Sequence, residues 1–307
     1  MKLKSNAIFI RAVRWTASGL AAGGLAMCVQ AQDTNVNLQA VQTAANQGDA
    51  KAQYELARCY EKGQGVPQDY AKAAAWLRQS ADQGYAAAEG QLGYYYGVGL
   101  GVAKDPAEAL KWYRKAADQG NVVAQYSMGY IFSTGRGTPV DQNQAVQWWQ
   151  KAAAQNLAGA QNALGQFYYQ QGGTNYASAL FWLRKAADQG YVPAMNNLGV
   201  MFDYGLGVPR NWSEAAKWYR LAAMQGDASA QGNLGVLYLD GRGVTNDLVQ
   251  AYVWFKLSAA QGNATGKSYL LEYQERQLLN TSQLAGAERM FDAFPRPPVH
   301  RPPPAAP

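Results

Sequence analysis

Apolar residues recur along the chain in two columns, and polar or glycine-rich stretches separate them. In the first column, a leucine or methionine has a small residue four positions before it and an aromatic residue four positions after it, as in Ala124, Met128 and Phe132. Side chains four residues apart lie on one face of an α-helix. In the second column, a tryptophan has alanines three positions before and five positions after it. The pattern therefore predicts two amphipathic helices in every period.

Both columns have the same period. The leucine column is Leu56, Leu92, Met128, Leu164, Leu198 and Leu234, and the tryptophan column is Trp76, Trp112, Trp148, Trp182, Trp218 and Trp254. Successive members are 36 residues apart, except for one step of 34 in each column, and both columns place this deletion between Leu164 and Trp182. The agreement predicts six helix-turn-helix units within 52–265. Their predicted bounds are 52–87, 88–123, 124–159, 160–193, 194–229 and 230–265.

A single unit cannot bury its own apolar face, so the units are expected to stack into an elongated array. A small residue follows each member of the leucine column directly: Ala57, Gly93, Gly129, Gly165, Gly199 and Gly235. Glycine inside a helix costs about 1 kcal/mol relative to alanine. Its recurrence indicates that a neighbouring helix crosses closely at this point. No stretch alternates long enough to predict a β-strand.

The links between the paired helices carry glycine-rich turns and capping residues. Gly-x-Gly begins at Gly63, Gly99, Gly135, Gly205 and Gly241. These glycines follow helices, so left-handed C-caps are expected; a phosphate loop would follow a strand and end in Lys-Ser/Thr. The second helix of each unit is expected to begin after an N-cap residue, and in some units a capping box is expected as well. The column is Asp69, Asp105, Asp141, Asn175, Asn211 and Asp247.

Residues 1–31 have the layout of a secretory signal peptide, with basic residues up to Arg14, an uncharged run and Val29-Gln30-Ala31 before the expected mature start at Gln32. The run is short and diluted by glycine and serine, which favours cleavage over a membrane anchor. Lipidation at Cys28 is a further alternative, although Met27 stands where a lipoprotein signal has a small residue. We expect a Gram-negative periplasmic or secreted protein with no membrane span after cleavage.

The segments beside the array are expected to close its ends. Residues 32–51 contain a helix in register with the second helix of a unit, and residues 266–293 contain two further helices. Residues 294–307 are rich in proline and are expected to be disordered or extended as polyproline II. A docking strip for a proline-binding groove is the alternative reading of this tail.

Composition and charge exclude several kinds of site. The 307 residues include one histidine, His300, and two cysteines, Cys28 and Cys59. A histidine triad, a site with several histidine ligands and a disulfide framework are therefore not expected. Much of the net charge of +6 comes from basic residues in 1–31, and the remainder is nearly neutral. A nucleic-acid-binding protein would show a stronger basic excess.

These residues together resemble the Sel-1-like repeat, a relative of the tetratricopeptide repeat. The second unit carries the pattern in Ala88, Leu92, Gly93, Tyr96, Gly99, Gly101, Val102, Asp105, Ala109, Trp112, Tyr113, Ala116, Ala117 and Gly120. The resemblance implies a right-handed α-solenoid that serves as a scaffold or adaptor and has no catalytic activity. The fourth unit departs from the pattern at 170–175, where curvature is expected to change. Some members carry paired cysteines and have been discussed as β-lactam-active, but this chain lacks such pairs.

The related tetratricopeptide fold implies that the first helices line a concave groove. Positions two before, two after and five after each leucine of the column are then expected to face it. The predicted partner-binding residues are Tyr54, Arg58, Tyr94, Tyr126, Tyr130, Asn162, Gln166 and Asn196. Tyrosine and asparagine are common at adaptable protein interfaces. The alternative is that these tyrosines are packing residues with hydrated hydroxyl groups.

The expected function is therefore that of an exported, monomeric, non-catalytic scaffold for a protein or peptide ligand. No cofactor, metal ion or nucleic acid is expected to bind. An envelope enzyme acting on carbohydrate or peptidoglycan, or a β-lactam-active protein, is the alternative class. It is disfavoured because most carboxylates stand at predicted caps or in loops at helix ends, and no two others are expected to meet.

Overall fold

The computed structural model describes residues 37–295, and these residues form α-helices and one 3₁₀ turn, without a β-strand. The first helices of units 1 to 6 are α3 (Ala50–Lys62), α5 (Ala86–Val98), α7 (Val122–Thr134), α9 (Ala158–Gln171), α11 (Val192–Tyr204) and α13 (Ala228–Asp240). The second helices are α4 (Tyr70–Asp82), α6 (Pro106–Asp118), α8 (Gln142–Ala154), α10 (Tyr176–Asp188), α12 (Trp212–Met224) and α14 (Leu248–Ala260).

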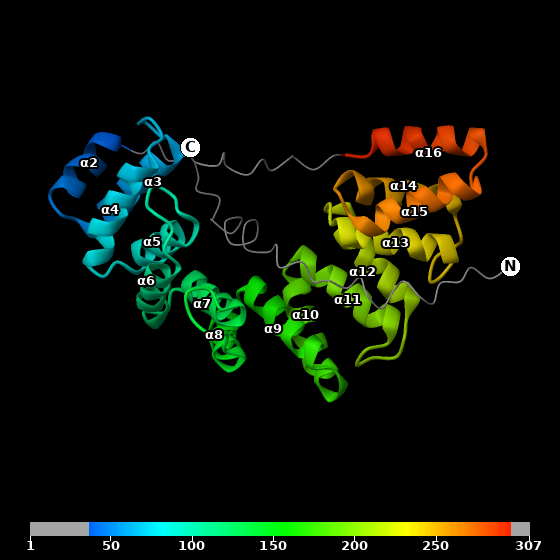
Figure 1. Ribbon diagram of the computed structural model, residues 1–307, viewed down its shortest axis with the longest axis horizontal. Helices are drawn as coiled ribbons and strands as arrows, with labels where there is room; N and C mark the ends of the chain where they lie inside the picture. Colours follow the sequence, from blue (N-terminus) through cyan, green and yellow to red (C-terminus); the bar gives the residue numbers. More distant parts are fainter. Residues whose placement is uncertain (1–36, 296–307) are drawn as a thin grey trace.

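Helices flank the six units at both ends. The helix α2 (Leu38–Asn46) precedes α3, while α15 (Ala264–Arg276) and α16 (Thr281–Ala293) follow α14. Each helix packs on its neighbours in sequence, and the resulting α-solenoid bends into an arch with an open side (Figure 1). The predicted signal peptide and most of the proline-rich tail lie outside the described residues. No helix in the described range is long and apolar enough to span a membrane.

The predicted close crossing lies between the two helices of each unit. A Cβ added to Gly129 would lie 2.3 Å from Trp149 Cδ1, and one added to Gly199 would lie 2.4 Å from Tyr219 Cδ1. A Cβ added to Gly165 would likewise clash with Leu183, and one added to Gly235 would clash with Phe255. Glycine is therefore required because a large side chain of the second helix lies directly over the backbone of the first helix. The crossing predicted from the glycine column is confirmed.

The side chain at this crossing is the residue after each tryptophan, not the tryptophan itself. Trp112, Trp148 and Trp254 are buried. The other three members of the column, Trp76, Trp182 and Trp218, are only half-buried. Half of the tryptophan column therefore belongs to the buried core, and the other half lies at its edge. Adjacent helix positions are about 100° apart, so both can be apolar while only one points at the facing helix.

The Gly-x-Gly turns have two separate roles. The first glycine is the left-handed C-cap of the first helix, as predicted, with φ of 83° at Gly99 and 73° at Gly135. The second glycine contacts the preceding unit: a Cβ on Gly101 would lie 2.2 Å from the Tyr70 carbonyl oxygen, at the start of α4. This turn therefore both ends a helix and packs one unit on the next.

The predicted N-caps form in five of the six units. Asp69, for example, accepts a hydrogen bond from the Lys72 backbone N–H at 2.9 Å. Asn175 is the exception, because it lies in the 3₁₀ turn Gly173–Asn175 and caps nothing with its side chain. The capping box expected in unit 2 is incomplete. Glu108 accepts a hydrogen bond from Trp112 Nε1 at 3.0 Å instead of from the backbone N–H of Asp105. A complete box is present in α16, between Asn280 and Gln283.

Buried glutamines join the helices through hydrogen bonds that the repeat pattern does not predict. Gln53 donates from Nε2 to the Ala45 carbonyl at 3.3 Å, and its Oε1 accepts from Gln83 Nε2 at 2.8 Å. The side chain thus connects the end of the previous unit, its own helix and the second helix of its unit. The same three-way connection recurs at Gln125 with Ala117 and Gln155, and at Gln231 with Ala223 and Gln261.

Glu89 occupies the glutamine position in unit 2. Its Oε2 accepts from Gln119 Nε2 at 2.7 Å, while the side chain is only 3% exposed. Burial raises the pKa of this carboxyl, and the nearby positive charge of Lys115 opposes the rise. A carboxylate cannot donate the hydrogen bond that glutamine makes to the preceding unit. Unit 2 thus has a titratable carboxyl group at the position where units 1, 3 and 6 have a glutamine amide.

Candidate functional site

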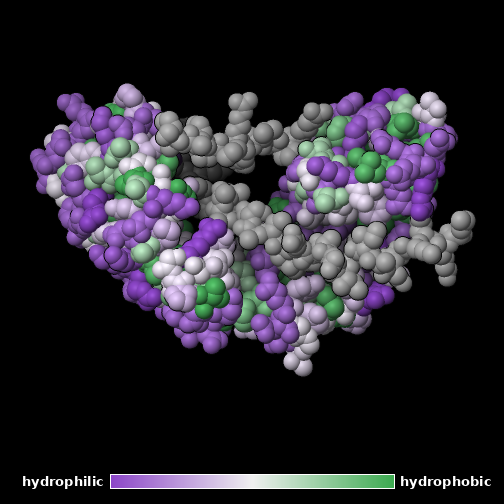
Figure 2. Space-filling view, viewed as in Figure 1, coloured by the Kyte–Doolittle hydropathy of each residue, from purple (hydrophilic) through white to green (hydrophobic). Residues whose placement is uncertain are grey.

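The candidate site is the inner side of the arch. In the N-terminal half, α3, α5 and α7 lie on this side and α4, α6 and α8 lie outside them (Figure 1). The space-filling view shows the hollow between the two ends of the arch (Figure 2). First helices repeat at the spacing of the units, so corresponding positions recur along the arch, although Val200 and Val236 in units 5 and 6 are buried. The inner face is defined here as the positions two before, two after and five after the leucine column.

At the N-terminal end, the structure brings the predicted residues Tyr54 and Arg58 together. The ring of Tyr54 lies 5.5 Å from that of Tyr85, and the Arg58 guanidinium lies 6.0 Å from the Tyr54 ring centre. Tyr94 on α5 is half-buried, and burial raises the pKa of its hydroxyl, with Glu61 adding to the rise. Tyr54, Arg58 and Tyr94 thus combine aromatic surface with one positive charge.

The middle of the inner face contains Tyr126 and Tyr130 on α7. Tyr126 packs on Gly159 of α9, where an added Cβ would lie 3.5 Å from its Cζ. It also contacts the buried cluster of units 2 to 4, and burial raises the pKa of its hydroxyl far above 10. Tyr126 is thus half-buried and packs against the core from the inner face. Tyr130 is half-buried with the Arg136 guanidinium 5.0 Å from its ring centre.

The predicted amide residues differ in accessibility. Asn162 is 6% exposed and accepts a hydrogen bond from Asn197 Nδ2 at 3.0 Å, so it links α9 to α11 within the array. Asn196 is half-buried and accepts from Asn233 Nδ2 at 3.1 Å, which links α11 to α13. Gln166 is half-buried on α9. Among the predicted amides, Asn162 therefore has a structural role.

Two carboxyl groups on the inner face were not among the predicted site residues. Glu61 accepts from Gln91 Nε2 at 3.0 Å, and Asp203 lies 3.6 Å from Arg242 Nη1. Burial raises the pKa of both carboxyls. Both stand five positions after a leucine of the column, and this position is the signal that could have identified them. They belong to units 1 and 5, so they do not form a catalytic pair.

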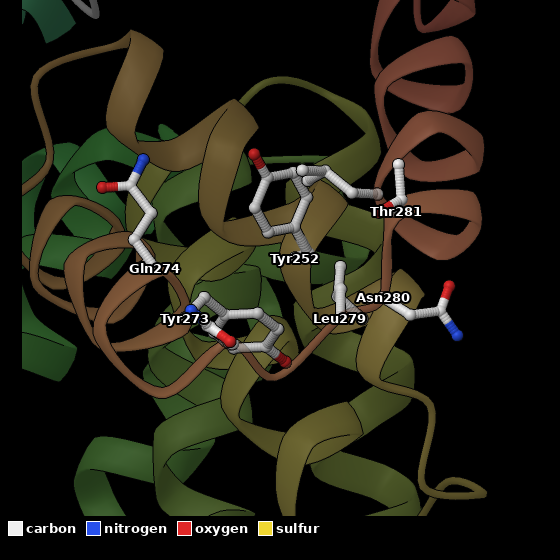
Figure 3. Close-up of a pocket in the computed structure, with 8 residues that line it drawn as sticks. Tyr252, Tyr273, Gln274, Leu279, Asn280 and Thr281 are labelled. Atoms are coloured by element: carbon white, nitrogen blue, oxygen red, sulfur yellow. The ribbon is translucent and has the colours of Figure 1, made fainter.

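A cavity of about 520 Å³ lies between α14, α15 and α16 (Figure 3). The hydroxyl of Tyr252 donates to Glu288 at 2.9 Å, and that of Tyr273 donates to the Leu248 carbonyl at 3.2 Å. The remaining lining includes neutral groups such as Gln274 and Asn280. Tyr252 thus holds α16 against α14, and Tyr273 holds α15 against α14. Within 37–295, no cluster of His, Cys, Asp and Glu could hold a metal ion.

A family model describes the repeated units directly. It is that of the Sel1 repeat, and it matches residues 50–85, 86–121, 122–157, 158–191, 192–227 and 228–263. The chain belongs to the Sel1 repeat family. Each match begins two residues before the corresponding unit predicted from the sequence, at the start of a first helix. Sel1 repeats form a helical scaffold fold used in protein interaction, and the resemblance drawn from the sequence is confirmed.

Two solved structures show the same architecture. A protective antigen of uropathogenic Escherichia coli with an SLR fold is 39% identical, with a TM-score of 0.74. The alignment covers 84% of this chain but only 56% of the antigen, so this Sel1-repeat chain spans little more than half of its length. A Sel1 repeat protein from Oxalobacter formigenes is 30% identical over 72% of this chain and 90% of its own, with a TM-score of 0.67. The comparison with curated proteins found no match.

Proposed function

We propose that this Sel1-repeat protein is an exported, non-catalytic scaffold that holds a polypeptide partner along the inner face of its arch. The observation that supports this most is the series of half-buried tyrosines on successive first helices, including Tyr54, Tyr94 and Tyr130. They provide apolar area together with hydroxyl groups that can exchange water for a partner's backbone. Interface energy usually concentrates in a few such aromatic or arginine anchors, each worth about 2 kcal/mol or more.

An extended polypeptide fits the repetition of this face. A chain bound along this face meets aromatic groups in units 1 to 3 and partly accessible amide or carboxyl groups, such as Gln166 and Asp203, farther along. Arg58 adds a charge that can pair with an acidic group of the partner. Half-buried rings are already ordered by their neighbours, such as Tyr54 by Tyr85, so little conformational entropy is lost on binding.

Export is the second part of the proposal. It rests on the order of basic residues, uncharged run and Val29-Gln30-Ala31 within the first 31 residues. A periplasmic or secreted location follows if the mature chain begins at Gln32. The scaffold would then act on a partner of the cell envelope or outside the cell.

Binding is tested with the double change Tyr94→Ala and Tyr130→Ala in the full-length protein. The partner is recovered from the native host by affinity purification and quantified by mass spectrometry. Gln147→Ala is the matched control because Gln147 is exposed on the second helix α8. We expect the double variant to lose the partner that the wild type and the control retain, with an unchanged far-UV spectrum. Equal recovery from all three proteins would contradict the inner face as the site.

A further inference from the structure

The junction between units 3 and 4 lacks contacts that join other neighbouring units. The first such contact is made by the second glycine of the Gly-x-Gly turn. A Cβ on this glycine would lie 2.4 Å from the Pro106 carbonyl oxygen at Gly137 and 2.3 Å from the Trp212 carbonyl oxygen at Gly243. In unit 4 the shortened turn has Gly173, around which an added Cβ would meet nothing within 4 Å. The start of α8 therefore receives no such turn from unit 4.

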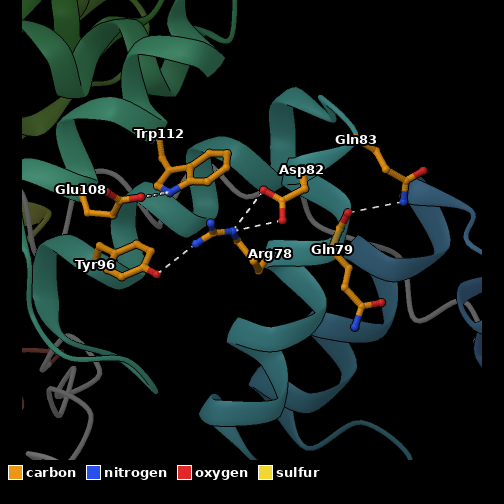
Figure 4. Close-up of polar contacts among 7 residues, drawn as sticks. All are labelled: Arg78, Gln79, Asp82, Gln83, Tyr96, Glu108 and Trp112. Carbon is orange, nitrogen blue, oxygen red and sulfur yellow. Dashed lines mark hydrogen bonds and ion pairs between the residues drawn. The ribbon is translucent and has the colours of Figure 1, made fainter.

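The second contact is an arginine that reaches an aromatic residue of the next unit. Figure 4 shows Arg78 of α4 donating to Asp82 of its own helix and to the Tyr96 hydroxyl of α5, beside the ring of Trp112. Arg114 lies 5.7 Å from the ring centre of Phe132. The same arrangement recurs for Arg184 over Phe202 and for Arg220, which donates to the Tyr238 hydroxyl at 2.9 Å.

In unit 3 this arginine is replaced by Gln150, opposite Tyr168 in the register of the repeat. The connection from α8 to α9 also has Asn156, with φ of 64°, where the other units have glycine. Asparagine tolerates this conformation better than most L-residues but less easily than glycine. Sequence deviations in the turn, the arginine and the helix connection thus coincide at a single junction.

Apolar packing remains across the junction. Trp148 and Trp149 of α8 belong to the same buried cluster as Leu164 of α9, and Trp182 of α10 packs against it. Such contacts are not directional, so one group of helices can rotate a little on the other while apolar area stays buried. Gln161 Nε2 also donates to Asn156 Oδ1 at 3.0 Å within this connection. The glycine and arginine contacts that join the other units are missing here.

We propose that the arch has a hinge between α8 and α9, so that residues 37–154 and 158–295 move as two arms. The hinge sets the separation of the two halves of the inner face. A partner that contacts both arms would select one separation from those already populated. This regulatory role rests on the proposed function, whereas the hinge itself does not depend on any partner.

Pairs of spin labels two units apart test the hinge in the protein alone. Labels replace the exposed residue six positions after each tryptophan, in a chain whose native cysteines are changed to alanine. The available positions are Asp82, Asp118, Ala154, Asp188, Met224 and Ala260. Pairs 82/154 and 188/260 lie within one arm, whereas 118/188 and 154/224 span the junction. Electron–electron resonance then gives a distance distribution for each pair.

We expect the two spanning pairs to give distributions about twice as wide as the pairs within an arm, because only they report the arrangements of the hinge. Gln150→Arg should narrow the spanning distributions by restoring the bridge to Tyr168. Gln147→Arg places the same charge one turn earlier on α8 and should leave them unchanged. Equal widths for all four pairs, or no narrowing with Gln150→Arg, would overturn the proposal. A missing partner would not affect either result.

Discussion

Replacing Gly137 with alanine should destabilise the array by two separable effects. The residue has φ of 74°, and a Cβ there would lie 2.4 Å from the Pro106 carbonyl oxygen and 2.7 Å from its carbon. The left-handed conformation of an L-residue costs about 1–2 kcal/mol. Forcing a methyl group against a packed backbone adds about 1–3 kcal/mol, because the helix α6 must shift. Gly137→Ala should therefore lower the free energy of unfolding by about 2–5 kcal/mol.

The chain offers two controls that isolate the packing effect. Gly120 has φ of 87° and Gly173 has φ of 56°, and a Cβ at either position would meet nothing within 4 Å. Alanine at either position should lower the free energy of unfolding only by the cost of the left-handed conformation, about 1–2 kcal/mol. Urea denaturation followed by far-UV circular dichroism compares the three variants with the wild type. Equal destabilisation by Gly137→Ala and Gly120→Ala would refute the contact between units.

Three further predictions concern the core, a buried acid and the leader. Trp148→Ala should lower the free energy of unfolding by about 3–5 kcal/mol, and Asp105→Ala by about 1 kcal/mol, as measured by thermal melts. A larger loss for Asp105→Ala than for Trp148→Ala would contradict the burial of Trp148. Because burial raises the pKa of Glu89, its carboxyl binds more protons in the folded than in the unfolded state, so the contribution of Glu89 to stability falls as pH rises above the ordinary carboxyl pKa. Glu89→Gln should therefore raise the free energy of unfolding more at pH 7 than at pH 4. An increase that is the same at both pH values would contradict a raised pKa of Glu89. Mass spectrometry of the exported protein should show a mature chain beginning at Gln32; a retained Lys2 or a lipid on Cys28 would contradict this.

The period, the turns and most helix starts could be predicted because each depends on a local rule. Gly99 ends a helix through its own φ, and Asp69 caps one through a hydrogen bond three residues away. Such effects repeat in every unit, so a column of residues reveals them. The rule fails at Asn175 because the two-residue deletion leaves too little chain for the usual turn, and the segment forms a 3₁₀ turn instead.

Contacts between helices were harder to predict. Gln53 and Gln83 are polar and 30 residues apart, so their residue type alone predicts that they lie on the surface. In the structure, their hydrogen bond joins the two helices of a unit. Tyrosine suits both a groove and a core, so its residue type does not separate the two roles at Tyr126. Its packing on Gly159 depends on how closely α7 and α9 approach, which the repeat pattern does not specify.

Photo-crosslinking along the array tests the central claim most directly. A benzoylphenylalanine is placed at Arg58, Tyr94, Tyr130 or Gln166 on the inner face, and at Gln147 or Phe181 on exposed parts of the second helices α8 and α10. After irradiation in the native host, our account predicts that the inner positions form adducts with the same polypeptide and that the outer positions do not. Adducts formed only at Gln147 or Phe181 would show that the partner binds the outer side of the arch.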